Sequence, residues 1–170
     1  KAALAYDIEG EKLVWWNNDF SINTISNNYV MGTAEKYGKQ ELVLDILTGM
    51  PCEASGDVRN PEKVERPHHY SADHQYFDTV QKFLNQKFNL LPIAALEYLE
   101  YHSFIFISCY LHENELANYL FVFSPDGELL LKEKLGEDLK GIGLDTFFIL
   151  SGCVFFLRNK GELVSYKIYD

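Results

Sequence analysis

The sequence predicts an all-β protein whose strands form β-propeller-like repeats of about 40 residues, interrupted by one amphipathic helix. The main signal is a recurring hairpin, in which an apolar run, a short turn ending in Gly and a second apolar run follow one another. The three turn glycines, Gly10, Gly49 and Gly127, are 39 and 78 residues apart. The triplet Glu-Leu-Val begins at Glu41 and again at Glu162, which is 121 residues later. Since a four-stranded blade takes about 40–45 residues, these spacings favour one blade per repeat.

A β-sandwich with evenly spaced hairpins is the alternative, because regular turns also occur in that fold. The shared period favours a propeller of roughly three blades, which is too few to close a ring, since closed propellers have about 4–8. The chain starts at Lys1 rather than Met, so a processed or cut chain is expected. Residues that precede Lys1, an open curved sheet or an oligomer would each account for the missing blades.

The first half is expected to hold the end of one blade and the whole of the next. In each hairpin, Gly tolerates the positive φ of a tight turn, and Asp or Ser can bond to the turn backbone. The flanking residues favour strands by type and partly alternate in polarity. The expected strands are Ala2–Asp7, Lys12–Asn17, Phe20–Ile25, Tyr29–Thr33, Glu41–Ile46 and a short one near Pro51–Glu53.

The second half repeats this pattern in longer and more apolar runs. A third blade is expected, followed by a fourth that stops before its last strand. The expected strands are Ala94–Tyr101, Phe104–Leu111, Ala117–Phe123, Glu128–Leu135, Thr146–Leu150, Cys153–Arg158 and Glu162–Tyr169.

Residues 54–92 interrupt the strands as a polar loop plus helix, inserted into what we expect to be a single domain, 1–170. Residues 54–73 are polar, contain two prolines and lack strand periodicity, so a long loop is expected. Residues 74–88 show apolar positions at helical spacing. Pro92 helps to stop this helix.

The helix presents one apolar stripe, and Asp73 can cap its first turn. We expect the stripe to pack on a blade face or at the rim. Binding of a protein partner through the same stripe is the alternative. The stripe consists of Phe77, Val80, Leu84 and Phe88.

Charge and length narrow the classes of partner. The 170 residues include 15 Lys and Arg against 25 Asp and Glu, which gives a net charge of −10. This balance argues against nucleic acid, because phosphate binding needs clustered cations. The longest nearly apolar stretch, 147–157, is shorter than the roughly 20 residues of a membrane-spanning helix. We expect a basic or neutral protein partner and no transmembrane segment, and the oligomeric state stays open.

The cysteines indicate the redox compartment. Cys52, Cys109 and Cys153 are an odd number, and no two of them are spaced as a C-x-x-C pair. A disulfide scaffold is therefore unexpected, and a reducing, cytoplasmic location is favoured.

The densest group of metal-ligating residue types lies at His68, His69, Asp73 and His74. Imidazole and carboxylate groups bind zinc and other transition metals. The spacing matches no established ligand motif, so a solvated polar loop in front of a helix is the simpler interpretation. Neither a cofactor nor a set of catalytic residues can be assigned.

Two segments of the first half, Ala2–Trp16 and Phe20–Pro51, resemble repeats of the quinoprotein-type β-propellers. In that family a strand ends in Leu-Asp, a turn ends in Gly, and the next strand carries a Leu-Trp pair. Tyr6-Asp7 and Leu44-Asp45 match the first element, and Val14-Trp15 matches the last. The second copy departs from the family at the Trp element, where it has Met50-Pro51.

The C-terminal half, from Phe77 to Tyr166, is similar to an uncharacterised bacterial family of propeller-like proteins without an assigned function. The quinoprotein resemblance implies the fold and not the cofactor, because the adjacent-cysteine pair of the quinone-dependent dehydrogenases is missing from this sequence. Related propellers without catalytic activity serve as assembly scaffolds and binding platforms.

Two functions follow as expectations. The first is a non-catalytic, propeller-like binding or scaffold module. The alternative is an enzyme, namely a metal-assisted hydrolase that uses the His68–His74 segment. The sequence favours the module, because its repeat pattern extends over most of the chain whereas the histidine segment matches no catalytic motif.

Overall fold

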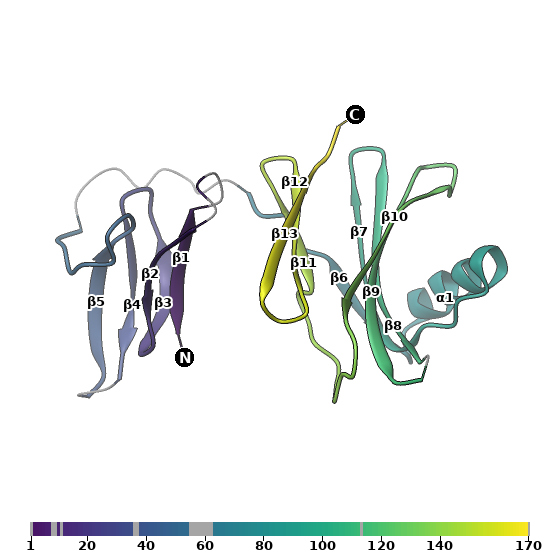
Figure 1. Ribbon diagram of the computed structural model, residues 1–170, viewed down its shortest axis with the longest axis horizontal. Helices are drawn as coiled ribbons and strands as arrows, with labels where there is room; N and C mark the ends of the chain where they lie inside the picture. The colour runs from purple at the N-terminus through teal and green to yellow at the C-terminus, as the bar shows by residue number, and fades with distance from the viewer. Residues whose placement is uncertain are drawn as a thin grey trace. The chain divides into compact units, whose positions relative to one another are not determined.

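The computed structural model describes residues 2–7, 10, 12–35, 38–54, 63–112 and 114–169. These residues are mostly in antiparallel strands, with one α-helix (Figure 1). The chain divides into two compact units, Lys1–Glu62 and Lys63–Asp170, where the sequence predicts one domain. No helix within the described residues has the length and apolar character that crossing a membrane requires.

The first unit contains two antiparallel sheets in which strands consecutive in sequence are neighbours. One sheet pairs β1 with β2, and the other has the order β3-β4-β5. A further bridge joins Leu44 of β5 to Pro51, where the sequence predicts a short fourth strand. The strands are β1 (Ala3–Asp7), β2 (Lys12–Asn17), β3 (Phe20–Ile25), β4 (Tyr29–Ala34) and β5 (Gln40–Asp45).

The two adjacent tryptophans of the first unit have different surroundings. Trp15 packs against the core cluster, and its indole Nε1 donates to the Ile46 carbonyl at 2.9 Å. Trp16 is 65% exposed. This difference follows from the strand, because successive side chains point to opposite faces. The core cluster itself consists of Ala3, Phe20, Val30 and Leu44.

The second unit is built on a five-stranded sheet of order β10-β9-β8-β7-β6 (Figure 1). Long apolar runs form its central strands, as expected where both faces of a sheet are covered. The strands are β6 (His68–Ser71), β7 (Ile93–Tyr101), β8 (Phe104–His112), β9 (Leu116–Phe123) and β10 (Leu129–Gly136).

The helix α1 (Gln75–Phe88) covers one face of this sheet (Figure 1). Phe77, Val80 and Leu84 are buried among sheet residues that include Ile107 and Phe121. This confirms the expected packing on a sheet. Partner binding through these three residues stays a prediction, and at most 9% of each residue is exposed.

A three-stranded sheet, β11-β12-β13, covers the opposite face. Phe147 and Phe156 of this sheet pack against Phe106 and Leu120 of the larger one. Successive apolar side chains of β8 and β9 point to opposite faces of the sheet, so each of these two strands contributes to both cores. The strands are β11 (Phe147–Leu150), β12 (Cys153–Arg158) and β13 (Glu162–Lys167).

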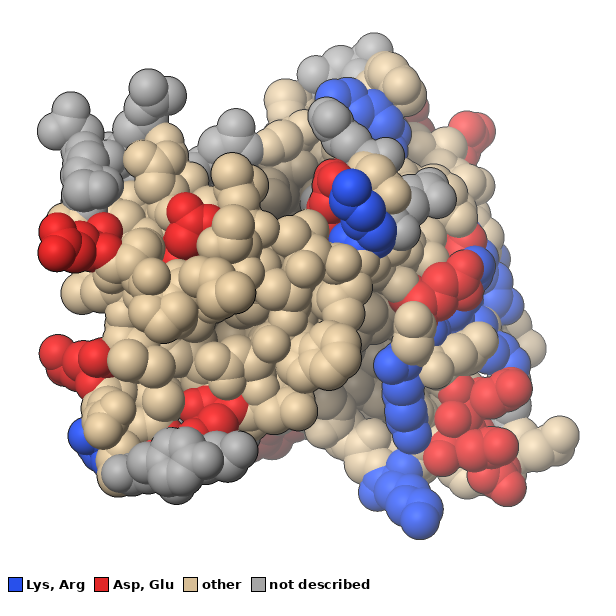
Figure 2. Space-filling view, turned by 60° about the vertical axis from the view of Figure 1, so that its left-hand side comes forward, with Lys and Arg blue, Asp and Glu red and all other residues tan. Residues whose placement is uncertain are grey.

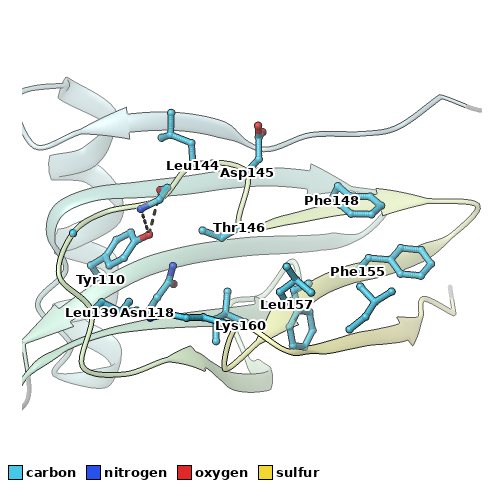
Figure 3. Close-up of a pocket in the computed structure, with 15 residues that line it drawn as sticks. Tyr110, Asn118, Leu139, Leu144, Asp145, Thr146, Phe148, Phe155, Leu157 and Lys160 are labelled. Carbon is cyan, nitrogen blue, oxygen red and sulfur yellow. Dashed lines mark hydrogen bonds between the residues drawn. The ribbon is translucent and has the colours of Figure 1, made fainter. Parts of the chain in front are cut away.

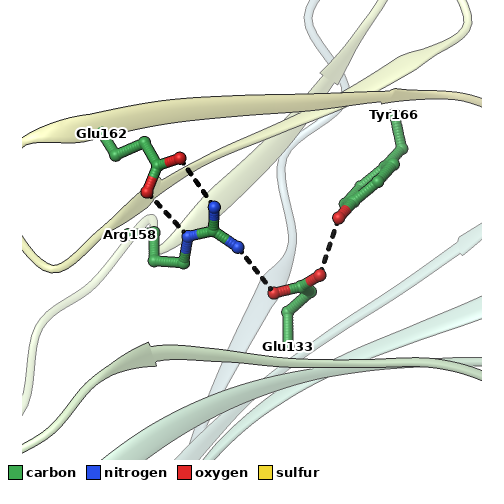
Figure 4. Close-up of polar contacts among 4 residues, drawn as sticks. All are labelled: Glu133, Arg158, Glu162 and Tyr166. Carbon is green, nitrogen blue, oxygen red and sulfur yellow. Dashed lines mark hydrogen bonds and ion pairs between the residues drawn. The ribbon is translucent and has the colours of Figure 1, made fainter.

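A polar cluster also joins the two sheets of the second unit (Figure 4). Arg158 of β12 forms a bidentate pair with Glu162 of β13, at 2.6 and 2.8 Å, and contacts Glu133 of β10 at 3.3 Å. Tyr166 of β13 donates to the same Glu133 at 2.6 Å. The hydrogen bond that Tyr166 donates to Glu133 raises the pKa of Tyr166, and the hydrogen bond from Arg158 lowers the pKa of Glu162.

Two details differ from the sequence prediction. Residues 68–71, expected within a loop, form β6, which pairs with β7 at the edge of the five-stranded sheet. The N-cap of α1 is His74 rather than Asp73, because the His74 ring nitrogen Nδ1 accepts the Tyr76 N–H at 3.2 Å. Asp73 instead accepts a hydrogen bond from the Ser71 hydroxyl. That bond lowers the pKa of Asp73.

Candidate ligand pocket

A cavity of about 480 Å³ opens in the second unit between the ends of β8, β9 and β10, the following loop, and β12 and β13 (Figure 3). Its size lies within the roughly 300–1,000 Å³ range of small-molecule sites. Most of its lining is apolar. The lining residues are Tyr110, Asn118, Leu135, Leu139, Gly141, Gly143, Leu144, Asp145, Thr146, Phe148, Phe155, Phe156, Leu157, Lys160 and Leu163.

Tyr110 fastens the loop that forms one wall of the cavity. Its hydroxyl accepts the Gly143 N–H at 2.7 Å and donates to the Gly143 carbonyl at 3.2 Å (Figure 3). The tyrosine is only 3% exposed. Both hydrogen-bonding functions of the phenol are therefore used to hold the loop backbone.

Glu97 of β7, inside the second unit, holds the end of the same loop through hydrogen bonds. This glutamate is 3% exposed. Its carboxylate accepts the backbone N–H of Asp145 at 2.5 Å and that of Thr146 at 3.0 Å, and it also contacts the Thr146 hydroxyl. Among the described residues, no Lys or Arg pairs with it. Backbone N–H and hydroxyl groups supply the hydrogen bonds that a buried carboxylate requires.

The polar network continues from Thr146 to the cavity. Thr146 Oγ1 lies 2.7 Å from Ser108 Oγ, and the Ser108 hydroxyl lies 2.9 Å from Asn118 Oδ1, to which it donates. Asn118 is 4% exposed, yet its amide nitrogen has no hydrogen-bond partner in the described part of the chain. In Figure 3 the amide lies among Tyr110, Thr146 and Leu157. The cavity thus contains an unused N–H donor held in place by buried neighbours.

Two charged residues lie at the cavity with different orientations. The Asp145 side chain points away from the other lining residues (Figure 3) and lies 3.5 Å from the Arg66 guanidinium. Lys160 lines the cavity, and no described residue forms an ion pair with it. The free polar groups that the cavity offers are therefore donors, namely the Asn118 amide nitrogen and the Lys160 ammonium group.

The histidine segment singled out in the sequence lies elsewhere in this unit. His68 and His69 are consecutive residues of β6, so their side chains leave opposite faces of the sheet. The His74 ring caps α1 and stacks on Tyr70 at 4.9 Å. Across the described ranges, no three His, Cys, Asp or Glu side chains gather as a metal site. Metal binding by His68, His69, Asp73 and His74 stays a prediction, as does the hydrolase built on it.

The three cysteines, all within the described residues, are free thiols. Burial raises the pKa of Cys109 to about 12, so that its thiol stays protonated at neutral pH. Cys52 is exposed. None of the three lines the cavity.

Sequence reasoning missed Glu97, Ser108 and Asn118. One signal could have found them. Each is a polar residue inside an otherwise apolar strand, as in IAALEYLEY, FIFISCYLH and LANYLFVF. A polar residue at a buried strand position needs a hydrogen-bond partner, and the partners here come from elements distant in sequence.

Comparison of the chain with family models, with curated proteins and with solved structures finds no match. The functional argument therefore depends on the geometry of the site itself.

Proposed function

We propose that this protein is a non-catalytic, propeller-like binding module and that the cavity around Asn118 holds its ligand. The observation that carries this proposal is the amide nitrogen of Asn118, a residue that is only 4% exposed, for which the described residues provide no acceptor. Every fully buried side-chain nitrogen and oxygen in the described part of the chain has a partner, so the unpaired Asn118 nitrogen is open to the cavity. A ligand that fills the cavity has to supply the acceptor, because a donor left buried without one costs about 1–3 kcal/mol.

The topology supports the propeller-like part of the proposal. Consecutive strands are neighbours in every sheet, as they are in propeller blades. The first unit also exposes large apolar side chains, and Figure 2, in which the side of this unit comes forward, shows a broad uncharged surface with carboxylates at its margins. Apolar sheet faces are what neighbouring blades bury against each other. Exposed side chains of this unit include Leu4, Leu13, Trp16, Ile22 and Ile25.

The lining of the cavity defines the chemical class of the ligand. Leucine and phenylalanine side chains form most of the wall, so the body of the ligand is apolar. The two free polar groups, on Asn118 and Lys160, are both donors, and one of them is a cation. The best complement is a small apolar or aromatic molecule with a carboxylate group.

The chemistry of the lining favours binding over catalysis. No His or Cys is among the lining residues. The phenol of Tyr110 already bonds to Gly143 through both its donor and its acceptor functions, and the Asp145 carboxylate points away. General acid–base catalysis needs a titratable group that reaches the reacting atoms. Tyr110 and Asp145 are committed to the structure, and we assign the remaining titratable lining residue, Lys160, to binding the charge of the ligand.

The test is an NMR titration of the ¹⁵N-labelled chain with three probes that share one apolar body, namely 3-phenylpropanoate, 3-phenylpropan-1-ol and 3-phenylpropylammonium. We expect saturable shifts of the Asn118 side-chain amide and of the Gly141 and Gly143 N–H signals. The carboxylate probe should bind about tenfold more tightly than the alcohol, because charged hydrogen bonds are worth about 1.5–3 kcal/mol.

Two matched variants locate the binding site. Leu157→Trp at the cavity should weaken binding of all three probes, whereas Leu91→Trp outside it should leave binding unchanged. The two leucines are equally exposed, at 57%. Asn118→Asp should weaken binding of the carboxylate probe most. Lys160→Gln removes the cation at an exposed position, so this variant tests the site without a change in the interior of the fold. Equal binding of the probes to the wild type and to Leu157→Trp would refute the proposed site.

A further inference from the structure

A second hollow, of about 340 Å³, lies on the helix-covered side of the five-stranded sheet. Three secondary-structure elements contribute tyrosines to it: β6 supplies Tyr70, α1 supplies Tyr76 and β7 supplies Tyr98. The remaining lining residues are Thr79, Val80 and Glu100. Aromatic rings and one carboxylate dominate this small site.

Two of the rings form adjoining walls. The centroids of Tyr70 and Tyr76 are 5.3 Å apart, and their planes are inclined at 60°. The His74 ring packs against both of them, stacked on Tyr70 at 4.9 Å and tilted against Tyr76 at 5.3 Å. Since His74 also caps the helix, the corner between the two tyrosines is held by backbone as well as by ring contacts.

Tyr98 and Glu100 give the hollow its electrostatic character. The Tyr98 hydroxyl donates to Glu100 Oε1. Burial, together with this hydrogen bond, raises the pKa of Tyr98, so that the phenol stays neutral at physiological pH. Of the residues that line the hollow, none is Lys or Arg. Its potential is therefore negative.

A negative hollow with aromatic walls attracts cations, because the face of an aromatic ring carries negative charge. The kind of cation follows from the acceptors present. The Thr79 hydroxyl donates to the Gln75 carbonyl at 3.2 Å, and Glu100 already accepts from Tyr98. The second carboxylate oxygen of Glu100 can still accept one N–H of a primary ammonium group, but the other N–H donors would face aromatic rings, whereas a quaternary ammonium group has no N–H to satisfy.

We propose that Tyr70, Tyr76, Tyr98 and Glu100 form a binding site for a quaternary ammonium group. The site is separate from the cavity around Asn118, because it lies on the other face of the same sheet and shares no lining residue with it. It selects a cation, whereas the Asn118 cavity selects an acceptor or anion. The two sites can therefore fail or succeed independently in experiment.

The test compares choline with 3,3-dimethylbutan-1-ol, which has the same shape but carries carbon in place of the charged nitrogen. Titrations are followed through the ring signals of the tyrosines and the backbone N–H signals of residues 74–79. We expect saturable shifts with choline, with a dissociation constant of about 1–10 mM, and binding of the neutral analogue at least about threefold weaker. Equal binding of the two molecules, or no shift with choline, would overturn the proposal.

Tyr76 is suited to mutation because it is 52% exposed. Tyr76→Phe keeps the ring and should bind choline within about twofold of the wild type, whereas Tyr76→Leu should bind at least about threefold more weakly. Glu100→Gln should weaken choline binding and leave the neutral analogue unaffected. Tyr169→Leu, at a tyrosine that is 76% exposed and lies outside the hollow, is the control. Choline binding that is unchanged in Tyr76→Leu would contradict the site.

Discussion

Gly49 ends the turn that follows β5 and lies directly against the indole ring of Trp15. Its backbone has φ of +69°, a conformation that residues with a side chain rarely adopt. A Cβ atom at this position would lie 2.7 Å from Trp15 Cγ and Cδ2. The same turn is held by Asp45, whose Oδ1 accepts the Thr48 N–H at 2.8 Å. Gly49 thus joins the turn to the core of the first unit.

Gly49→Ala should destabilise the first unit by about 2 kcal/mol or more, because backbone strain and a steric clash with Trp15 add together. Chemical denaturation followed by tryptophan fluorescence measures this. Gly38→Ala is the control, since Gly38 has φ of +98° but, among the described residues, no atom lies within 4 Å of an added Cβ. The free energy of unfolding of that variant should fall by only about 1 kcal/mol. Equal losses of unfolding free energy in the two variants would show that the contact with Trp15 does not contribute to the effect of Gly49→Ala.

At the scale of elements, β12 and β13 are tied to β10 through Arg158. Its guanidinium pairs with Glu162 on the neighbouring strand and with Glu133 on the other sheet (Figure 4). A bidentate pair fixes geometry as well as charge. The hydrogen bond from Arg158 lowers the pKa of Glu162 below its ordinary value of 4.5.

This lowered pKa predicts a dependence of stability on pH. A carboxyl group whose folded-state pKa is depressed stabilises the fold above its unfolded pKa, and the contribution is lost as the pH falls through the folded value. Glu162→Gln should therefore lower the urea midpoint at neutral pH, and its difference from the wild type should vanish as the pH falls below 4.5. A difference that persists in acid would mean that the pair acts through packing rather than charge.

Strand positions were largely predictable from the sequence, because turn chemistry and alternation are local. The prediction Cys153–Arg158 coincides with β12, and Phe104–Leu111 differs from β8 by one residue. β6 was missed, since His68-His69-Tyr70-Ser71 has no apolar alternation. As an edge strand it pairs on one side only, with β7, so its side chains need not all be apolar.

The whole chain consists of two units that differ greatly in their cores. The core cluster of the first unit contains Ala3, Phe20, Val30 and Leu44. The second unit has two clusters, one on each face of its larger sheet, and every member of both lies within residues 70–168. Because hydrophobic stabilisation scales with buried apolar area, the second unit is expected to be the more stable one.

Residues 63–170, produced without the first unit, should therefore fold by themselves. We expect their ¹⁵N–¹H spectrum to overlay on the signals of the same residues in the full chain and their thermal unfolding to be cooperative. Residues 1–62 alone should unfold at a lower temperature, since a unit of about 60 residues is marginally stable. Loss of dispersed signals from 63–170 would show that the first unit is needed to fold the second.

The candidate site was far less predictable than the strands. Glu97 and Thr146 are 49 residues apart in sequence, and Tyr110 and Gly143 are 33 apart. No local pattern connects such positions, because the fold alone brings them together. The metal hypothesis for the His68–His74 segment, by contrast, depended on local composition alone. In the structure, Tyr70 of this segment and Tyr76 just after it line the hollow of about 340 Å³.

The two anchors of the loop after β10 have a kinetic consequence for any occupant of the larger cavity. Tyr110 holds Gly143, and Glu97 holds Asp145 and Thr146, so the wall is already ordered before a ligand arrives. Association then needs no folding of this segment, and little conformational entropy is lost on binding. Differences in affinity among ligands should therefore arise mainly from their dissociation rates, since the approach to a preformed wall is much the same for each of them.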